Sequence, residues 1–226
     1  MSRDVILGRV RSAIGADPEN LERRGAVATR LAEPPHHLVP AIACAPSAEL
    51  LARFEAALRS RAADLIAVAA AHEIPGAIAH FLRAHGLDLH VRAGSDPYLT
   101  ALPWPTAPDL TIETGPAQAG DSAGLSRALA GVAETGTLVL ASGDDNPVTL
   151  AYLPGTHLVV LEASAIVGSY ETAMQRVAAR YGAGTLPRTL NLISGASRTA
   201  DIGGKVVMGA HGPRRLAVLV VGAPSS

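Results

Sequence analysis

The side chains best suited to chemistry lie near the carboxyl end of the chain, in a segment rich in glycine and hydroxyl groups. Its candidate binding residues are Ser194, Gly195, Ser197, Arg198, Thr199 and Asp201. The segment follows an apolar run, Leu190 to Ile193, that is typical of a β-strand. In an open α/β sheet, loops at the carboxyl ends of strands are where ligands bind. A loop that then opens a helix offers backbone N–H groups, and an arginine fork suits carboxylate or phosphate, so the segment outlines a small-anion site.

The alternative for this segment is a loop with a structural role only. Ser197 or Thr199 would then cap the next turn, and Arg198 would pair with Asp201 three residues later. Such loops are common in α/β proteins, so the residue types alone favour this second interpretation.

The loop Met208-Gly-Ala-His-Gly-Pro213 holds the second candidate, His211, together with Gly212. An unperturbed imidazole has a pKa of about 6.5, which allows proton transfer near neutral pH. The alternative is a turn whose shape is set by Gly212 and Pro213 while the imidazole bonds a carbonyl group. Because the sequence supplies no geometry, both interpretations stay open.

The third candidate is the run Glu134, Thr135, Gly136 and Thr137, which leads into another β-prone stretch. Glu134 is a candidate general base, nucleophile or capping partner. A carboxylate that only fixes nearby backbone donors is the interpretation that the residue types favour. We therefore take Glu134 and His211 as the catalytic candidates and the other residues of the three motifs as binding candidates.

Alternating strands and helices must position these residues. Short β-prone apolar runs predict strands at 65–69, 89–91, 110–112, 137–141, 157–162, 190–193 and 216–221. Apolar residues at helical spacing, with capping residues, predict helices at 2–15, 47–58, 75–86, 122–131 and 169–181. The alternation predicts an α/β domain over residues 45–226, with a mostly parallel sheet covered on both faces. Residues 1–44 are predicted as an N-terminal helix and an irregular arm.

The composition is that of a compact globular protein. Of 226 residues, 48% are hydrophobic and 17% are charged, which excludes a disordered chain. With a formal net charge of −1 and 3% aromatic residues, no nucleic-acid partner is predicted. The N-terminus lacks the continuous apolar core of a signal peptide, and no apolar run approaches the roughly 20 residues of a membrane span. We expect a cytoplasmic protein.

The sequence predicts no metal and no cofactor. The single cysteine, Cys44, cannot form an internal disulfide or hold a zinc ion or iron–sulfur cluster alone. The eight histidines are dispersed without metal-ligand spacing. Neither a phosphate-binding loop nor the Gly-x-Gly-x-x-Gly motif of dinucleotide-binding proteins is present.

The three motifs together resemble the lactate-utilisation protein C family, the LUD-domain proteins. The matching segments are Ala133-Glu-Thr-Gly-Thr137, Ser194-Gly-x-Ser-Arg-Thr-Ala-Asp-Ile202 and Met208-Gly-x-His-Gly-Pro213. The match covers roughly residues 45–222 in order and spacing, which is more specific than any single motif. Ala196 stands where the family is expected to carry proline, a change that removes a rigid turn residue and no polar group.

The resemblance implies the sugar-isomerase and CoA-transferase-like fold, a three-layer α/β/α arrangement around a mixed sheet. It also implies a role in L-lactate utilisation, as the component without clusters in an iron–sulfur system that oxidises lactate to pyruvate. With one cysteine and no flavin or nicotinamide motif, the chain is expected to be an accessory subunit. Its expected partners are iron–sulfur proteins, and its loops are expected to bind a small anionic ligand or a partner's surface.

A free-standing enzyme is the competing hypothesis. It would act on an acyl-CoA, sugar phosphate or folate-like substrate, with Glu134 or His211 as acid or base and the loop from Ser194 to Thr199 as anion cradle. The first helix has an apolar face that must be buried, so a homo-oligomer also stays open.

Overall fold

The structure is a computed structural model that describes residues 2–15, 17, 19–33, 38–182, 184–202 and 205–222. The side chains of residues 200–206 lie outside this description. The chain forms two compact units, Met1–Leu38 and Val39–Ser226. The three motifs belong to the second unit.

The smaller unit contains two helices. α1 (Arg3–Ile14) is capped by the hydroxyl of Ser2, as predicted. The segment expected to be irregular contains α2 (Leu21–Ala32), which is capped by the side chain of Asn20. Charged residues and Gly25 separate the apolar residues of α2, so its helical spacing is hard to see in the sequence.

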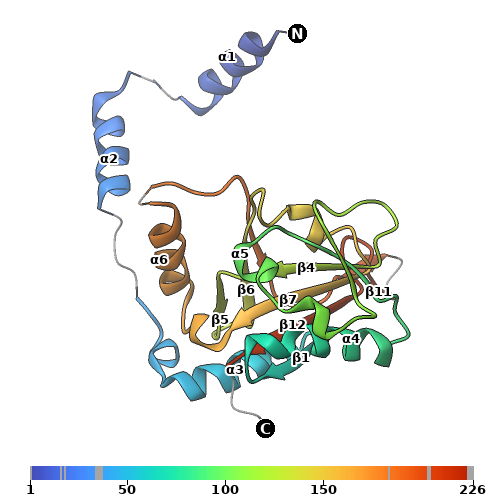
Figure 1. The fold of residues 1–226 in the computed structure, drawn as a ribbon. Helices are drawn as coiled ribbons and strands as arrows, with labels where there is room; N and C mark the ends of the chain where they lie inside the picture. Colours follow the sequence, from blue (N-terminus) through green and yellow to red (C-terminus); the bar gives the residue numbers. More distant parts are fainter. Residues whose placement is uncertain are drawn as a thin grey trace. The chain divides into compact units, whose positions relative to one another are not determined.

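The larger unit is built on a central sheet in which six described strands are all parallel, in the order β1-β12-β7-β4-β2-β3 (Figure 1). The strands are β1 (Ala63–Val68), β2 (His90–Ala93), β3 (Thr111–Thr114), β4 (Ala123–Arg127), β7 (Thr156–Glu162) and β12 (Arg215–Val221). β12 lies between β1 and β7, with Val218 opposite Leu65 on one side and Val159 on the other. Because neighbouring strands are parallel, their carboxyl ends meet at one edge.

A second, smaller sheet has the order β8-β5-β6-β9. Its strands are β8 (Ile166–Val167), β5 (Ala130–Val132), β6 (Thr137–Ala141) and β9 (Leu190–Ile193). β6 pairs antiparallel with both β5 and β9, whereas β5 and β8 are parallel. Two of the three motifs directly adjoin strands of this sheet.

Helices pack against the two sheets of the larger unit. They are α3 (Ser47–Arg59), α4 (Ile74–Ala84), α5 (Pro97–Thr100) and α6 (Tyr170–Tyr181), with short 3₁₀ turns η1 (Ala41–Cys44), η2 (Ala71–Glu73), η3 (Trp104–Thr106), η4 (Val148–Ala151) and η5 (Ala163–Ala165). Leu158 of β7 packs with Ile78 of α4 on one face. Its neighbour Val159 points the other way and packs with Phe54 of α3 and Leu138 of the second sheet. The predicted α/β class with a mostly parallel central sheet is confirmed.

The second sheet is itself buried on both faces. Leu138 and Leu140 of β6 face the central sheet, whereas Val139 between them packs with Ala173 and Val177 of α6. Because side chains alternate along β6, the second sheet packs on the central sheet with one face and on α6 with the other.

The helix predicted over residues 122–131 is wrong, because this segment forms β4 and β5. Its short run of small and apolar residues fits a buried strand as well as a helix. Packing decides the outcome, since β4 pairs with both β2 and β7. Gly124 allows the carbonyl oxygen of Leu150 to approach so closely that any Cβ would collide with it.

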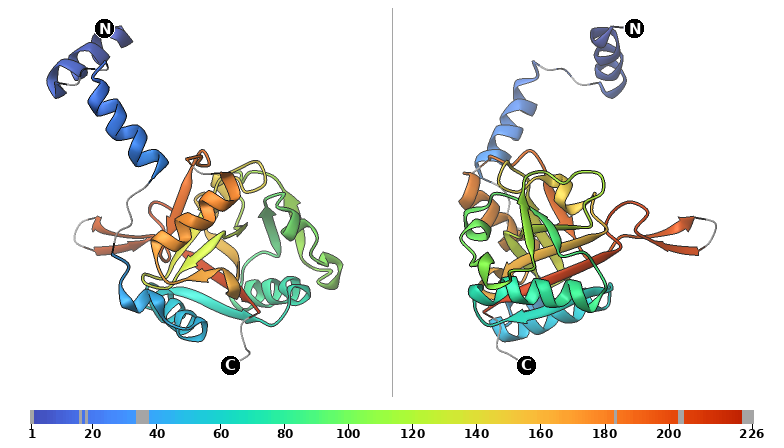
Figure 2. Two further views of the ribbon diagram at one scale, coloured as in Figure 1. Left: turned by 90° about the vertical axis from the view of Figure 1, so that its left-hand side faces the viewer. Right: turned by 45° about the vertical axis from the view of Figure 1, so that its right-hand side comes forward.

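The helix expected to open after the Ser194 loop is also absent from the described residues. Instead, β10 (Arg198–Ile202) and β11 (Lys205–Met208) form an antiparallel ribbon in which Arg198 is opposite Met208. Figure 2 shows this ribbon extending away from the two sheets. This segment therefore does not offer the free backbone N–H groups of a helix start.

Candidate functional site

The structure brings the Ser194 and His211 loops together through backbone hydrogen bonds. The N–H of Ser197 donates to the carbonyl of Pro213 at 2.9 Å, and the N–H of Gly209 donates to the carbonyl of Ser197 at 2.9 Å. The Ser197 hydroxyl also accepts from the N–H of His211 at 3.4 Å. Ser197 thus joins the two loops, which pass on either side of the β10–β11 ribbon.

A cluster of four hydroxyl groups connects the third motif to these loops. Thr137 lies within hydrogen-bond distance of Thr135 at 2.6 Å, of Tyr170 at 2.9 Å and of Ser194 at 2.6 Å. Tyr170 also contacts Thr135 at 2.9 Å. Thr137 is fully buried, so these contacts satisfy a hydroxyl that has no access to water.

The donor and the acceptor of each hydrogen bond in this cluster follow from a count of hydroxyl protons and contacts. Four hydroxyl groups share four contacts, and each hydroxyl has one proton to donate. If all four contacts are hydrogen bonds, Ser194 must donate to Thr137, because that is its only contact within the cluster. The oxygen of Ser194 then presents lone pairs, and acts as an acceptor, on its other side.

Arg61 fastens two of the motifs to α3 and was not among the sequence candidates. Its Nη1 donates to the carbonyl of Thr135 at 2.8 Å and to that of Ala57 at 3.0 Å. Gly195 has φ of +125° and lies against Arg61, because a Cβ at Gly195 would be 2.6 Å from the Cβ of Arg61. The hydrogen bond from Arg61 to Thr135 joins residues 74 positions apart, so no local sequence pattern predicts it.

A cavity of about 250 Å³ opens between the joined loops. Five sequence candidates line it, namely Ser194, Gly195, Ser197, His211 and Gly212. Tyr152 and His157, which the sequence analysis did not select, complete its polar lining. No described lysine or arginine side chain is among its lining residues, and the polar side chains that line it carry hydroxyls and imidazoles. We call this space the motif cavity.

The remaining candidates lie elsewhere. Glu134 is exposed in the turn between β5 and β6, where its N–H donates to the carbonyl of Gly168 at 3.2 Å, and it does not line the motif cavity. Gly136 packs on α3, since a Cβ there would be 2.7 Å from that of Ala57. Arg198 is exposed on β10, beside Thr199. The side chain of Asp201 lies outside the described residues.

His157 is the most unusual group in the motif cavity. It is 1% exposed, its Nε2 is 3.0 Å from the hydroxyl of Ser126, and its Nδ1 has no partner among the described residues. Burial lowers the pKa of His157 from 6.5 to about 3, so the imidazole is neutral near pH 7. An unpaired nitrogen in a buried ring is able to bond a ligand that enters the cavity.

The motif cavity does not lie at the carboxyl ends of the central strands. His157 and Leu216, the second residues of β7 and β12, line it, so it lies at their amino ends. The Ser194 loop does follow the carboxyl end of β9, but β9 belongs to the second sheet, so the loop does not join the carboxyl edge of the central sheet. Sequence places a strand before the loop and does not say which sheet that strand joins.

Comparison with known proteins now identifies the family. Residues 51–221 match the sequence description of the LUD domain. The chain belongs to the LUD-domain family. Lactate utilization protein C of Deinococcus radiodurans is 34% identical to this LUD-domain protein over 181 residues, which is 77% of this chain and 81% of that protein. The resemblance seen in the three motifs is thus confirmed.

Other relatives share a shorter region with this LUD-domain protein. Lactate utilization protein C of a Geobacillus strain is 36% identical over 91 residues, 40% of this chain and 38% of that protein. An uncharacterized protein of Neisseria meningitidis is 37% identical over 99 residues, 44% of this chain and 42% of that protein. In both alignments the chain spans less than half of the relative's length.

A solved structure supports the fold of the LUD domain. The crystal structure of a DUF162 family protein from Deinococcus radiodurans superposes with a TM-score of 0.57 and 28% sequence identity. The superposition covers 79% of this chain and 99% of that chain.

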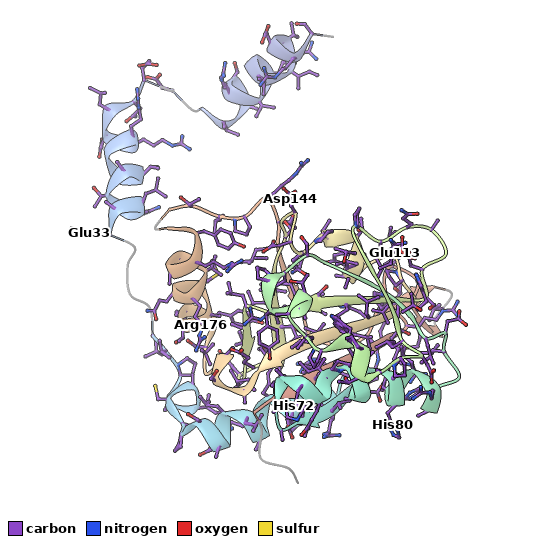
Figure 3. The ribbon with its side chains drawn as sticks, viewed as in Figure 1. Glu33, His72, His80, Glu113, Asp144 and Arg176 are labelled. Carbon is purple, nitrogen blue, oxygen red and sulfur yellow. The ribbon has the colours of Figure 1, made fainter. Side chains whose placement is uncertain are left out.

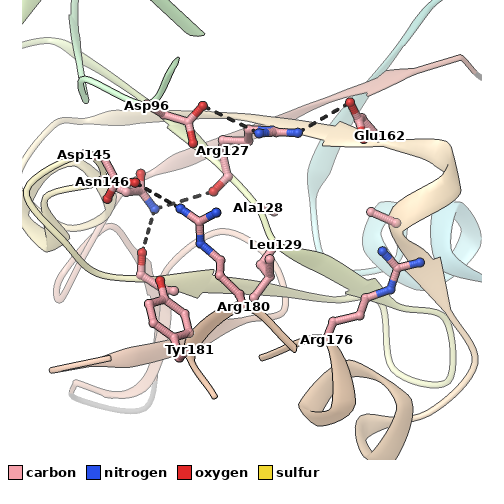
Figure 4. Close-up of a pocket in the computed structure, with 12 residues that line it drawn as sticks. Asp96, Arg127, Ala128, Leu129, Asp145, Asn146, Glu162, Arg176, Arg180 and Tyr181 are labelled. Carbon is pink, nitrogen blue, oxygen red and sulfur yellow. Dashed lines mark hydrogen bonds and ion pairs between the residues drawn. The ribbon is translucent and has the colours of Figure 1, made fainter. Parts of the chain in front are cut away.

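A second cavity of the LUD domain, of about 210 Å³, lies at the carboxyl edge of the central sheet (Figure 4). Arg127 and Glu162, the last residues of β4 and β7, line it, with Asp96 from the loop after β2. α6 contributes Arg176 and Arg180. We call this space the edge cavity; none of the sequence candidates whose side chains are described lines it.

The described residues offer no metal centre. No group of three histidine, cysteine, aspartate or glutamate side chains within the described ranges is placed to hold an ion. His72 and His80, which lie on η2 and α4, are exposed (Figure 3). Among the residues described, no helix has the length and apolar character needed to cross a membrane.

Proposed function

We propose that this LUD-domain protein acts in lactate utilisation as an accessory component, beside iron–sulfur proteins that oxidise L-lactate to pyruvate. The observation that carries the proposal is the alignment with lactate utilization protein C of Deinococcus radiodurans over 77% of this chain. The sequence contains one cysteine, Cys44, whereas iron–sulfur clusters are usually held by about four cysteines. The clusters of such a system would therefore belong to its partners.

The motif cavity is the binding site in this proposal. Ser194 offers an acceptor oxygen, the Ser197 hydroxyl still has its own proton to donate, and the Nδ1 of His157 lacks a partner among the residues that the structure describes. The lining suits a ligand or partner segment that bears hydroxyl or amide groups. Arg198, exposed on the ribbon that leaves the cavity, supplies a cation outside it.

Deletion of the gene from the organism that carries it tests the role. We expect growth on L-lactate to be lost and growth on pyruvate to be normal, because pyruvate enters metabolism after the proposed step. Restoring the wild-type gene should restore growth on L-lactate. Normal growth of the deletion strain on L-lactate would refute the role.

Complementation with variants tests the site. Ser194→Ala and Ser197→Ala should fail to restore growth on L-lactate although the protein accumulates to wild-type levels. Ser12→Ala is the matched control, because Ser12 is exposed on α1 and does not line the motif cavity. Full restoration of growth by both cavity variants would show that the function does not depend on this cavity.

Purification of the tagged protein from cells grown on L-lactate tests the partners. We expect cysteine-rich proteins that carry iron to elute with it, detected by mass spectrometry and iron quantification. A protein that elutes alone would instead favour a free-standing enzyme. In that hypothesis His211, which lines the motif cavity, is the candidate acid or base, because Glu134 does not line it.

A further inference from the structure

The edge cavity has two walls of opposite charge. On one side, Arg127 lies between two carboxylates, 3.6 Å from Asp96 and 3.4 Å from Glu162. On the other side, Arg176 and Arg180 project from α6, and one carboxylate, Asp145, lies 3.2 Å from Arg180. Figure 4 shows the two groups facing the same space. The first wall therefore carries a surplus negative charge and the second a surplus positive charge.

Arg176 is a cation of this cavity that has no charged partner among the described residues. It lies one helical turn before Arg180, so both guanidinium groups reach the same side of α6. Arg176 donates to the carbonyl of Ser164 at 2.7 Å and forms no ion pair with a described carboxylate. A guanidinium bonded only to a carbonyl retains donors suited to a carboxylate.

Asn146 adds an unpaired acceptor to the same cavity. Its side chain is 8% exposed, and its Nδ2 donates to the carbonyl of Ala141 at 3.0 Å and to that of Arg127 at 3.5 Å. Because both partners are carbonyl groups, the amide orientation is fixed with nitrogen toward them. Its Oδ1 then has no partner among the described residues. Buried acceptors of this kind normally bond a donor.

The loop that carries Asn146 is held at the end of β2 by a close backbone approach. Any Cβ at Gly94 would collide with the carbonyl oxygen of Asp145. Ser95 also donates to the carbonyl of Asp144, at 3.4 Å. The backbone that carries Asn146 is thus held in place, which favours a preformed binding site over an incidental cavity.

From this arrangement we propose that the edge cavity binds a small zwitterion of the amino-acid class. The carboxylate of the ligand bonds Arg176 and Arg180, and its ammonium faces Glu162, Asp96 and the Oδ1 of Asn146. The volume of about 210 Å³ is below the roughly 300–1,000 Å³ typical of drug-sized ligands, so the ligand has few heavy atoms. This inference is independent of the motif cavity and of the proposed role in lactate utilisation.

Isothermal titration of the full-length protein with matched small molecules tests the charge pattern. L-alanine and β-alanine are the zwitterions, with their charges one and two carbons apart. L-lactate and propionate have similar size and carry the carboxylate without the cation. We expect one zwitterion to bind at least about tenfold tighter than both carboxylates, because only it satisfies both walls. Equal or tighter binding of L-lactate or propionate that Arg176→Gln weakens would overturn the proposal, and so would binding of neither zwitterion.

Two variants locate the site. Arg176→Gln should weaken binding of the zwitterion about tenfold, since it removes the guanidinium that forms no ion pair with a described carboxylate. Glu162→Gln should weaken the zwitterion and leave propionate unchanged or tighter, a readout that loss of folding would not produce. Arg59→Gln, at the exposed end of α3, is the charge-matched control and should bind as the wild type does. Unchanged zwitterion binding by Arg176→Gln would place the ligand elsewhere.

Discussion

Mild acid should destabilise this protein through His157. The pKa of its imidazole is lowered by burial from 6.5 to about 3. Between these two values the unfolded chain binds a proton at this position and the folded chain does not, so stability falls as the pH drops below 6.5. Above that pH both states are neutral and His157 contributes no pH dependence.

The size of the effect follows from the two pKa values. Each pH unit below the unfolded value costs about 1.4 kcal/mol. At pH 5, about 1.5 units lower, His157 should reduce the free energy of unfolding by about 2 kcal/mol relative to pH 7.5. That is a substantial part of the roughly 5–15 kcal/mol by which a domain is stable.

Urea unfolding at pH 7.5 and pH 5 measures this loss, and a variant isolates its source. His157→Gln keeps a polar group near Ser126 and removes the titration. The wild type should lose about 2 kcal/mol more than the variant between the two pH values, because all other groups cancel in the difference. His80→Gln, an exposed histidine on α4, should keep the wild-type loss. Equal losses in the wild type and His157→Gln would refute the reasoning about burial.

Two further predictions concern Gly195, which lines the motif cavity, and Thr137, which contacts its lining residue Ser194. Thr137→Val replaces a buried hydroxyl by a methyl of similar shape and leaves Ser194 without its partner, so urea unfolding should show a loss of about 1–3 kcal/mol. Gly195→Ala should cost about 2 kcal/mol or more by the same assay, because it adds a contact with Arg61 to the strain of φ at +125°. Gly120→Ala, with φ of +101° and open space around it, carries the strain alone and should cost clearly less. If the two alanine variants lose equal stability, the contact with Arg61 is unimportant.

Local chemistry made several features predictable from sequence. Ser169 caps α6 by accepting from the N–H of Thr172, and an apolar, β-branched run forms β12. Both depend on residues close in the chain, where capping and side-chain preference act. The α/β class followed from the alternation of such elements. The linked motifs identified the family because their order and spacing are properties of the sequence itself.

Features that depend on contacts between distant residues were decided only by the tertiary structure. The run 122–131 is a pair of strands because β4 pairs with β2 and β7, and small residues have no strong preference of their own.

The candidate site divides in the same way. Hydroxyl-rich loops were visible as candidates, whereas Arg61, Tyr152 and His157 reach them from segments far away in the chain. The edge cavity had no sequence signal, because its opposed charges come from the ends of β4 and β7, two loops and one helix. Sequence therefore determined which residues are available, and long-range packing determined which of them share a cavity, since burial and charge depend on neighbours in space.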